Sequence, residues 1–200
     1  MIAIIDYSAG NLHSVKNALD YCHAPCVISN DKDEIMAADR VILPGVGAFG
    51  DAMASLKKEG LVNVIGDFIA TGKPFLGICL GLQLLFESSE ESPGVTGLGL
   101  LPGKVLRLPD RGLKIPHIGW NDLSLHKTDG IFRGIGSNPY MYFVHSYYLQ
   151  AEDFSIVSAT AQYGTEIHAA VAKNNLYATQ FHPEKSGDVG LRILKNFTTI

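Results

Sequence analysis

The chain has 200 residues, of which 46% are hydrophobic and 18% are charged, and its formal net charge is −4. This composition predicts a globular protein with a substantial core and excludes a disordered chain. The acidic balance excludes the electrostatic footprint of a nucleic-acid or anionic-membrane binder, and no apolar run approaches the length of a membrane span. Because the N-terminus also lacks a basic leader, we expect a cytoplasmic protein, and three cysteines make no disulfide framework.

The first half of the chain predicts four strand–helix units in succession. Apolar runs predict strands at residues 2–6, 25–30, 40–43 and in the segment that enters Gly77. The helical patterns that follow are one capped by Asn11, a short one opened by Asp31 or Asp33, one from Ala48 towards Ala70 with a break at Gly60, and one ending near Glu87. Such a series is typical of a parallel sheet wrapped by helices, with functional loops at the strand C-termini.

The second half has a different pattern. Residues 88–102 are rich in Gly, Ser, Glu and Pro and predict a loop. Alternating or β-branched runs predict strands at residues 104–108, 113–125, 140–150, 156–163, 167–173 and 176–181, and residues 191–197 predict a closing helix. We therefore expect an α/β fold in one domain, residues 1–200, with a mostly parallel central sheet and an antiparallel extension.

One stretch, Gly77-Ile-Cys79-Leu-Gly81, has the spacing of a nucleophile elbow. Small residues two places either side of the cysteine allow a strand, a tight turn and a helix to pack closely. Cys79 would lie at the helix N-terminus, where the dipole favours a thiolate, and the Leu80 N–H would face an oxyanion. The alternative is a buried cysteine in an ordinary turn.

A base for this nucleophile is expected in His182-Pro-Glu184, which follows the strand at residues 176–181. Residues two apart in an extended segment point to the same side, so Glu184 can hold one ring nitrogen of His182 while the other faces a thiol. The alternative is a salt-bridged histidine at a strand end. The spacing favours a Cys79–His182–Glu184 triad. His145, which has no nearby carboxylate in sequence, is the second candidate base.

Other residues are candidates for completing the site. The glycines of Pro44-Gly45-Val46-Gly47 allow a backbone N–H to approach a ligand, which makes this turn a candidate second oxyanion donor; a plain turn is the alternative. Gln83, one helical turn after Cys79, is placed to face a substrate, unless it is a surface glutamine. The polar strand end His145-Ser146-Tyr147 is suited to a small polar ligand.

Two further stretches contain residues that are common in binding sites. Trp120, the sole tryptophan, lies in Pro116–Asn121, and it suits either the core or a partner surface. The segment Cys22-His-Ala-Pro-Cys26 supplies at most three metal ligands, so we favour packing roles for it. The sequence predicts neither a metal nor a cofactor.

The elbow and the His-Pro-Glu stretch together resemble the class I (triad-type) glutamine amidotransferases. Longer stretches resemble one family among them, the glutaminase subunits of imidazole glycerol phosphate synthase. These stretches span nearly the whole chain and are 6–15, 43–50, 116–121, 142–147 and 181–186. Ser8 departs from the family, which commonly has glycine there. The resemblance implies the three-layer α/β fold of that class.

The resemblance also implies a reaction. Cys79 attacks the carboxamide of glutamine, His182 protonates the departing ammonia and then activates water on the thioester, and Glu184 orients the imidazole. The other implied roles are oxyanion donors from Leu80 and the Val46–Gly47 peptide, and a glutamine pocket formed by Gln83, His145, Ser146 and Tyr147.

A partner is implied as well. In this family a separate cyclase subunit, a (β/α)₈ barrel, receives the ammonia and makes imidazole glycerol phosphate and aminoimidazole carboxamide ribotide in histidine biosynthesis. The positions that match the docking surface of the resulting heterodimer are Asn11, Trp120, Tyr142 and Lys185. We also expect the Val46 peptide to rest with its carbonyl towards the site until the partner binds.

Three other functions are alternatives to this glutaminase subunit. A glutaminase of another pathway, such as pyridoxal phosphate or anthranilate synthesis, is disfavoured by stretches 43–50 and 116–121. A non-catalytic binding module of the same fold is disfavoured by the intact Cys79, His182 and Glu184. A cysteine peptidase would need an open cleft and a peptide substrate, and the sequence indicates neither.

Overall fold

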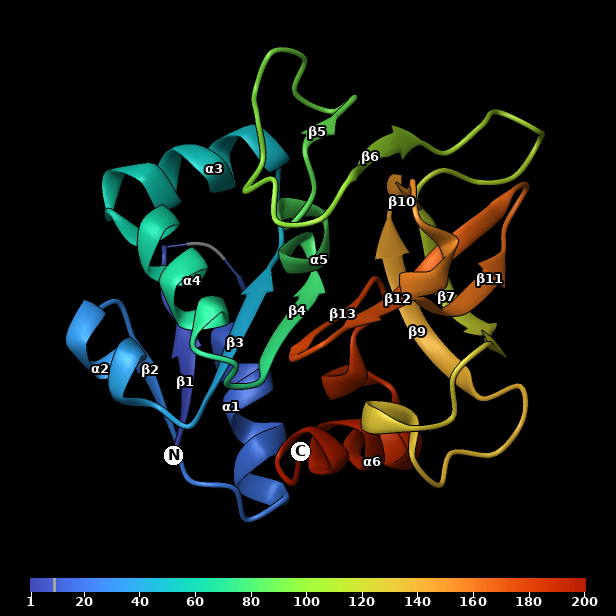
Figure 1. The fold of residues 1–200 in the computed structure, drawn as a ribbon. Helices are drawn as coiled ribbons and strands as arrows, with labels where there is room; N and C mark the ends of the chain where they lie inside the picture. Colours follow the sequence, from blue (N-terminus) through green and yellow to red (C-terminus); the bar gives the residue numbers. More distant parts are fainter. Residues whose placement is uncertain (9) are drawn as a thin grey trace.

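An eight-stranded sheet forms the centre of the computed structural model, which describes residues 1–8 and 10–200 (Figure 1). In spatial order its strands are β2 (Cys26–Ser29), β1 (Ile2–Ile5), β3 (Arg40–Gly45), β4 (Phe75–Cys79), β13 (Leu176–Thr179), β12 (Glu166–Lys173), β11 (Val157–Gln162) and β8 (Ser124–Leu125). The first five strands are parallel and the last three are added antiparallel. The predicted fold class, a mostly parallel sheet with an antiparallel extension, is confirmed.

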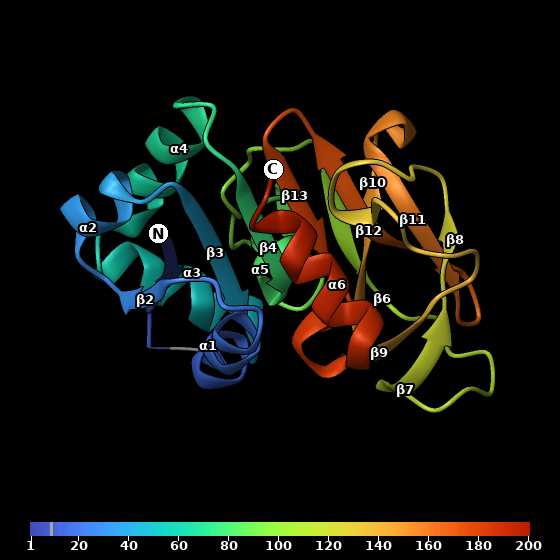
Figure 2. The ribbon, with the colours of Figure 1, turned by 90° about the horizontal axis from the view of Figure 1, so that it is seen from below.

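Helices cover both faces of this sheet and make three layers. They are α1 (Leu12–Tyr21), α2 (Lys32–Ala37), α3 (Phe49–Lys58), α4 (Leu61–Ala70), α5 (Leu80–Leu84) and α6 (Gly187–Phe197). Because successive strand residues point to opposite faces, Ala3 and Ile5 pack in one cluster with α2 to α5, whereas Ile2 and Ile4 pack in another with α1 and α6. In Figure 2, α1 and α6 lie together on the near side of the sheet.

Several helix boundaries differ from the predicted ones. The break at Gly60 is confirmed, with a φ of 66° that separates α3 from α4. Asp31 caps α2 by accepting from the Glu34 N–H at 2.9 Å, but Asn11 makes no side-chain cap, so that expectation is wrong. The elbow helix ends at Leu84, before Glu87, and α6 begins at Gly187, four residues before the predicted start.

Part of the predicted antiparallel extension is wrong. Residues 103–107 (β6) pair with β5 (Ser88–Ser89) and β10 (Tyr147–Ala151) in a separate sheet, and β7 (His117–Asp122) pairs with β9 (Tyr140–His145) in a third. The expected single strands 113–125 and 140–150 each divide, the second at Ser146, and their halves join different sheets. Strand pairing depends on contacts distant in sequence, which alternation alone does not specify. Short 3₁₀ turns are η1 (Gly130–Phe132), η2 (Phe154–Ile156) and η3 (Pro183–Lys185).

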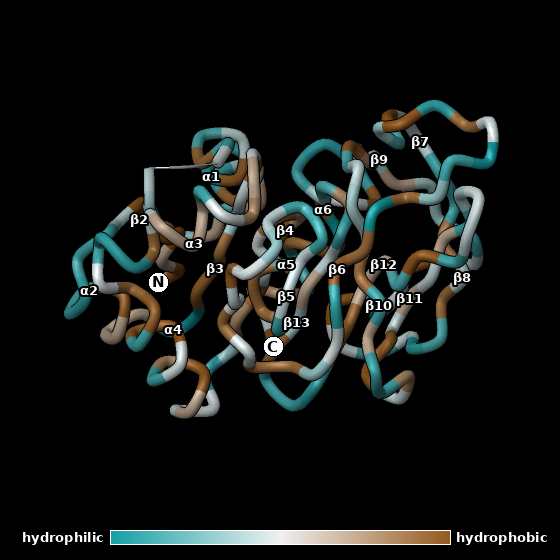
Figure 3. The backbone as a smooth tube through the Cα atoms, turned by 90° about the horizontal axis from the view of Figure 1, so that it is seen from above, coloured by the Kyte–Doolittle hydropathy of each residue, from teal (hydrophilic) through white to brown (hydrophobic). Residues whose placement is uncertain are grey.

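The polarity of the chain follows this layering. Figure 3 shows hydrophobic residues along the central strands and hydrophilic residues in many outer turns. Within the described part of the chain, no helix combines the length and the apolar character needed to span a membrane.

The turn after β1 explains the one departure from the family pattern. Ser8 has a φ of 65°, in the left-handed region that glycine adopts without strain. The Ser8 N–H donates to Asp6 Oδ1 at 2.9 Å, which helps to hold this conformation. The neighbouring Ala9 lies outside the described residues.

The elbow itself is a site of strain and close packing. Cys79 ends β4 with a φ of 56° and a ψ of −107°, a conformation that costs of order 1–3 kcal/mol for a non-glycine residue. A Cβ on Gly77 would lie 2.7 Å from the Gly81 carbonyl oxygen, and one on Gly81 would overlap the Leu43 carbonyl oxygen. The flanking glycines are therefore required by packing against α5 and β3, as the spacing predicts.

Alanine at Gly81 should test this packing. The Cβ would collide with backbone, which cannot move aside as a side chain can, so we expect Gly81→Ala to lower the free energy of unfolding by about 3 kcal/mol or more. The matched control is Gly66→Ala within α4, where a Cβ meets nothing within 4 Å. That change should stabilise the protein by about 0.5–1 kcal/mol. Urea denaturation measures the stability of both variants. Equal unfolding midpoints for Gly81→Ala and Gly66→Ala would contradict the proposed packing constraint.

Candidate active site

A buried histidine–carboxylate pair lies just after β13, at the start of η3. His182 Nδ1 is 2.8 Å from Glu184 Oε1, and the two side chains are 2% and 1% exposed. The carboxylate can only accept, so Nδ1 carries the proton and Nε2 remains available for acid–base chemistry. The structure thus brings the two residues together as the two-residue spacing predicts.

His182 lies near Cys79, the third member of the predicted triad. Nε2 is buried with no hydrogen-bond partner in residues 1–8 and 10–200, yet Cys79 is close enough to alter its titration. Burial lowers the pKa of His182, but the Cys79 sulfur, in its thiolate form, and the Glu184 carboxylate outweigh it and raise the pKa to about 10. An imidazolium beside a thiol, oriented by a carboxylate, is the arrangement of an activated cysteine nucleophile.

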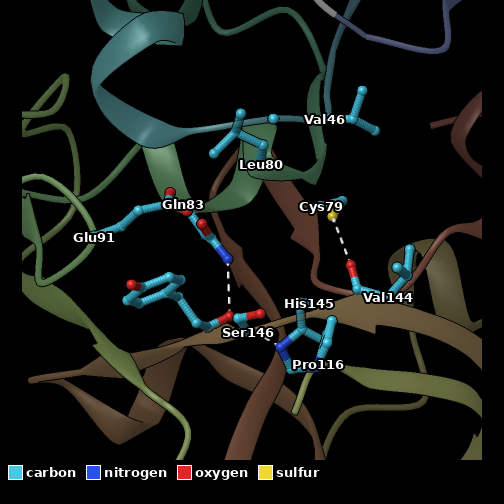
Figure 4. A pocket seen from close by; sticks show the side chains of 11 residues that line it. Val46, Cys79, Leu80, Gln83, Glu91, Pro116, Val144, His145 and Ser146 are labelled. Atoms are coloured by element: carbon cyan, nitrogen blue, oxygen red, sulfur yellow. Dashed lines mark hydrogen bonds between the residues drawn. The ribbon is translucent and has the colours of Figure 1, made fainter.

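The Cys79 sulfur lies at the edge of a pocket of about 280 Å³, close to the ~300 Å³ lower bound for small-ligand sites (Figure 4). The residue is 7% exposed, and Sγ lies 3.9 Å from the Val144 carbonyl oxygen and 3.8 Å from Gln180 Nε2. The pocket is lined by Val46, Gly47, Cys79, Leu80, Gln83, Glu91, Pro116, Val144, His145, Ser146 and Tyr147. All the predicted oxyanion and glutamine residues are therefore in its wall, while His182 and Glu184 line a narrow void behind it.

The predicted oxyanion donors lie on the same side of the pocket, at the ends of β3 and β4. Leu80 is the first residue of α5, so its N–H has no partner within that helix. Gly47 has a φ of 101°, which side-chain-bearing residues rarely adopt, although a Cβ there would meet nothing within 4 Å. Glycine is required at this position by backbone conformation and not by space.

Gln83 and His145 both contact the same carbonyl group in the pocket wall. Gln83 Nε2 donates to the Tyr147 carbonyl at 3.0 Å, and His145 Nδ1 contacts the same oxygen at 2.9 Å. His145 Nε2 lies 3.0 Å from His117 Nδ1, so both of its ring nitrogens are engaged. Burial and the neighbouring His117 lower the pKa of His145 to about 3. His145 is thus neutral and has no free nitrogen, and the geometry favours His182 as the base.

His117 and Glu91 are site residues that our sequence analysis missed. His117, buried at 3% exposure, stacks on Tyr163 with ring centroids 3.9 Å apart, and its pKa is lowered by burial to about 4. Glu91 lines the pocket from the predicted loop 88–102, and its Oε2 accepts from the Phe49 N–H at 2.8 Å. Nothing in the local sequence distinguishes Glu91 from its acidic neighbours. Its role depends on the path of the loop, which brings it to the start of α3.

The predicted partner-interface residues lie on the same side of the molecule as the triad. Trp120 on β7 is opposite Tyr142 on β9, with ring centroids 6.2 Å apart, and Trp120 is 56% exposed. The Tyr142 carbonyl accepts from the His182 N–H at 3.0 Å, which ties β9 to the triad. Lys185 is exposed on η3, and Asn11 borders the void that contains His182.

The cysteine-rich segment has other contacts. Cys22 Sγ lies 3.7 Å from the Leu191 carbonyl and Cys26 Sγ 3.7 Å from Asp20 Oδ1. Over the described ranges, no three His, Cys, Asp or Glu side chains gather as a metal site would require.

Comparisons with known proteins identify the class of protein to which the chain belongs. The family model "Glutamine amidotransferase class-I" matches residues 3–200. A solved structure titled as a glutamine amidotransferase covers 100% of both chains with a TM-score of 0.78 at 19% identity. The structure of PurLQS from Thermotoga maritima covers 99% of this chain and 97% of its own, with a TM-score of 0.76 at 23% identity. Fold and site together define a class-I glutamine amidotransferase.

Relatives of higher sequence identity show which family within this class the chain belongs to. Imidazole glycerol phosphate synthase subunit HisH of Moorella thermoacetica is 53% identical over 98% of this chain and 93% of its own. The subunits of Methanothermobacter thermautotrophicus and Thermosynechococcus vestitus are 51% and 54% identical, and each covers 100% of this chain, with 98% and 96% of their own lengths. The chain belongs to the HisH family of class-I glutamine amidotransferases.

The buried histidines should make stability depend on pH. In the folded protein the pKa values of His145 and His117 are far below the ordinary value of 6.5. As the pH falls below 6.5, these histidines therefore bind protons in the unfolded chain but not in the folded one, which lowers the free energy of unfolding. His145 alone should lower the free energy of unfolding by about 2 kcal/mol between pH 6.5 and 5. His182, whose folded pKa is raised to about 10, binds its proton more tightly in the folded state and so opposes this loss slightly near pH 6.5, but not once the unfolded histidine is protonated as well.

His117→Asn is the matched control for that measurement. Its amide can donate to His145 Nε2 but does not titrate, so the slope between pH 7 and 5 should be smaller than in the wild type. Burial also lowers the pKa of His168, which contributes equally to both proteins. Denaturant titrations at several pH values provide the comparison, and a flat wild-type profile would refute the neutral histidine pair.

Proposed function

We propose that this chain is the glutaminase subunit of an imidazole glycerol phosphate synthase, and that Cys79, His182 and Glu184 are its catalytic residues. The observation that carries the proposal is the buried His182–Glu184 pair, which has one ring nitrogen free and lies near Cys79 at a strained elbow. The family shares this function by name. The substrate is glutamine and the products are glutamate and ammonia.

The reaction follows from the positions of these groups. The Cys79 thiolate attacks the side-chain carbonyl carbon of glutamine, and the developing oxyanion accepts from the Leu80 N–H and the Val46–Gly47 peptide. His182 transfers its proton to the departing nitrogen, which releases ammonia and leaves a thioester. Neutral His182 then takes a proton from water as the water attacks the thioester, and returns it to the sulfur as glutamate leaves. Glu184 keeps Nε2 directed at these atoms.

The shape of the pocket supports one orientation of glutamine. In Figure 4, Glu91 and Gln83 lie at one end of the pocket and Cys79 at the other. With the carboxamide at Cys79, the α-ammonium group would reach the Glu91 carboxylate, whose position is held by the Phe49 N–H. Gln83, His145, Ser146 and Tyr147 would shape the wall between the two ends.

Glu91→Gln should test this orientation. The amide keeps the shape of the side chain but removes the negative charge that faces the ammonium group, so we expect KM for glutamine to rise about tenfold or more, with kcat changed much less. Steady-state glutaminase kinetics measure KM and kcat separately. Glu90→Gln, a neighbour outside the pocket lining, is the control; an unchanged KM in Glu91→Gln would exclude the role.

We further propose that the partner is a separate cyclase subunit with a (β/α)₈ barrel, which forms a heterodimer with this chain and receives the ammonia. One face of the β7–β9 pair supports a docking surface there, because Ile118, Trp120 and Tyr140 are each more than half exposed. Asn11, Tyr142 and Lys185 would extend this surface around the triad. We also propose that residues 1–200 form a single domain and that the protein acts in the cytoplasm.

Partner binding is proposed to switch the site on. Gly47, in its left-handed conformation, allows the Val46–Gly47 peptide to present either its carbonyl or its N–H to the pocket at low cost. We expect the carbonyl to face inward in the free subunit and docking beside Val46 to favour the N–H. The isolated subunit would then be nearly silent.

Glutamate release by the purified chain, with and without a cyclase subunit and its nucleotide ligand, tests the function. A large rise on adding both is expected, and Cys79→Ala should abolish glutamine-dependent synthesis while added ammonia still supports it. Strong activity that the cyclase does not change would keep the triad but assign another pathway. No activity under any condition would refute the proposal.

A further inference from the structure

A buried glutamine on the pocket's inner side has no role in the reaction as described above. Gln180 follows β13, two residues before His182, and is 0% exposed. Its backbone N–H donates to the Ala169 carbonyl at 2.8 Å, so the residue is fixed to β12. A fully buried amide is costly unless its donors and acceptors are used, and its side-chain contacts therefore indicate what it does.

A chain of hydrogen bonds determines which end of the Gln180 amide faces Cys79. The Tyr147 carbonyl can only accept, so the Gln83 atom 3.0 Å from it must be the nitrogen. The same Gln83 nitrogen is 3.1 Å from Gln180 and must donate there too, so the Gln180 atom is its oxygen. The Gln180 nitrogen is therefore the atom that points the other way, 3.8 Å from Cys79 Sγ.

We propose that Gln180 donates a side-chain N–H to the Cys79 sulfur and so favours and positions the thiolate. This inference rests on the proposed role of Cys79 as the nucleophile. A hydrogen bond donated to an anion is worth more than one donated to a neutral group, so the N–H favours the charged form of the sulfur. Gln83, held by the Tyr147 carbonyl, acts here as the group that keeps Gln180 in the correct orientation.

The other groups around the sulfur make this donor important. His182, from η3, is the charged neighbour, and Tyr7, after β1, is a neutral phenol because burial and Cys79 raise its pKa. The Tyr7 hydroxyl donates to the Pro44 carbonyl at 3.0 Å and is not available to the sulfur. On the β9 side, the Val144 carbonyl lies 3.9 Å from Sγ and opposes a negative charge. His182, as a nearby cation, and Gln180, as a hydrogen-bond donor, then offset this effect.

A simpler role for Gln180 would be to hold Gln83 and nothing more. In that case its replacement would alter glutamine binding or stability, but not the reactivity of Cys79 towards a small reagent that ignores the pocket. The two roles therefore differ in the pH dependence of thiol alkylation.

The test is the rate of Cys79 alkylation by iodoacetamide from pH 5 to 10, followed by mass spectrometry of the Cys79 peptide. Gln180→Glu keeps the shape and the acceptor for Gln83 but replaces the N–H with an oxygen. We expect it to alkylate about tenfold more slowly at pH 7, with the profile displaced to higher pH. Gln180→Met should change in the same direction by about threefold. Gln150→Glu, an exposed position on β10, is the matched control and should behave as the wild type.

Internal references separate the possible outcomes. Cys22 and Cys26, in the same digest, should be alkylated equally in all variants, and thermal unfolding checks that each variant is folded. Unchanged Cys79 profiles in folded Gln180→Glu and Gln180→Met, beside an active wild type, would overturn this inference alone. A wild-type Cys79 no more reactive than Cys22 and Cys26, in a chain without glutaminase activity, would overturn the proposed function as well.

Discussion

The close approach of α5 to β3 is the constraint on which the site depends. A Cβ on Gly81 would overlap the Leu43 carbonyl, and one on Gly77 would press against Gly81, so the turn between β4 and α5 can be this tight only with glycine at both places. The strained conformation of Cys79 is imposed by this packing. As a result the sulfur reaches the carboxyl end of the sheet, where the parallel strands β3 and β4 bring Val46, Gly47 and Leu80 beside it.

Two buried histidines at this site have opposite electrostatic environments. His182 gains a carboxylate and a thiol, which raise its pKa to about 10 against the effect of burial. Burial, together with the neighbouring His117 and His182, lowers the pKa of His145 to about 3, and the Tyr147 carbonyl that it contacts only partly opposes this. One residue type is thus charged beside the Cys79 sulfur and neutral in the pocket wall, because only His182 has a carboxylate and a sulfur that outweigh the effect of burial.

Cys79 and the pocket wall belong to one connected polar network. The Tyr147 carbonyl accepts from both Gln83 and His145, Gln83 contacts Gln180, and Gln180 contacts Cys79. Beyond His145, His117 lies 3.4 Å from Asn121, on the strand that also carries the exposed Trp120. Because each member has an assigned donor or acceptor, the proposed docking face and the sulfur are linked by groups whose orientations depend on one another.

The sequence by itself determined the first four parallel strands, the elbow, and the adjacency of His182 and Glu184, because each depends on residues close together in the chain. It placed β13 in the antiparallel extension, whereas that strand pairs parallel with β4. It also placed Gln83, His145, Ser146 and Tyr147 at one pocket through family resemblance. Only the tertiary structure decided that strands 103–107 and 140–151 leave the main sheet, and that Glu91, His117 and Gln180 belong to the site. Those contacts join segments far apart in the chain, and a buried polar side chain is recognisable only from the partners that satisfy it.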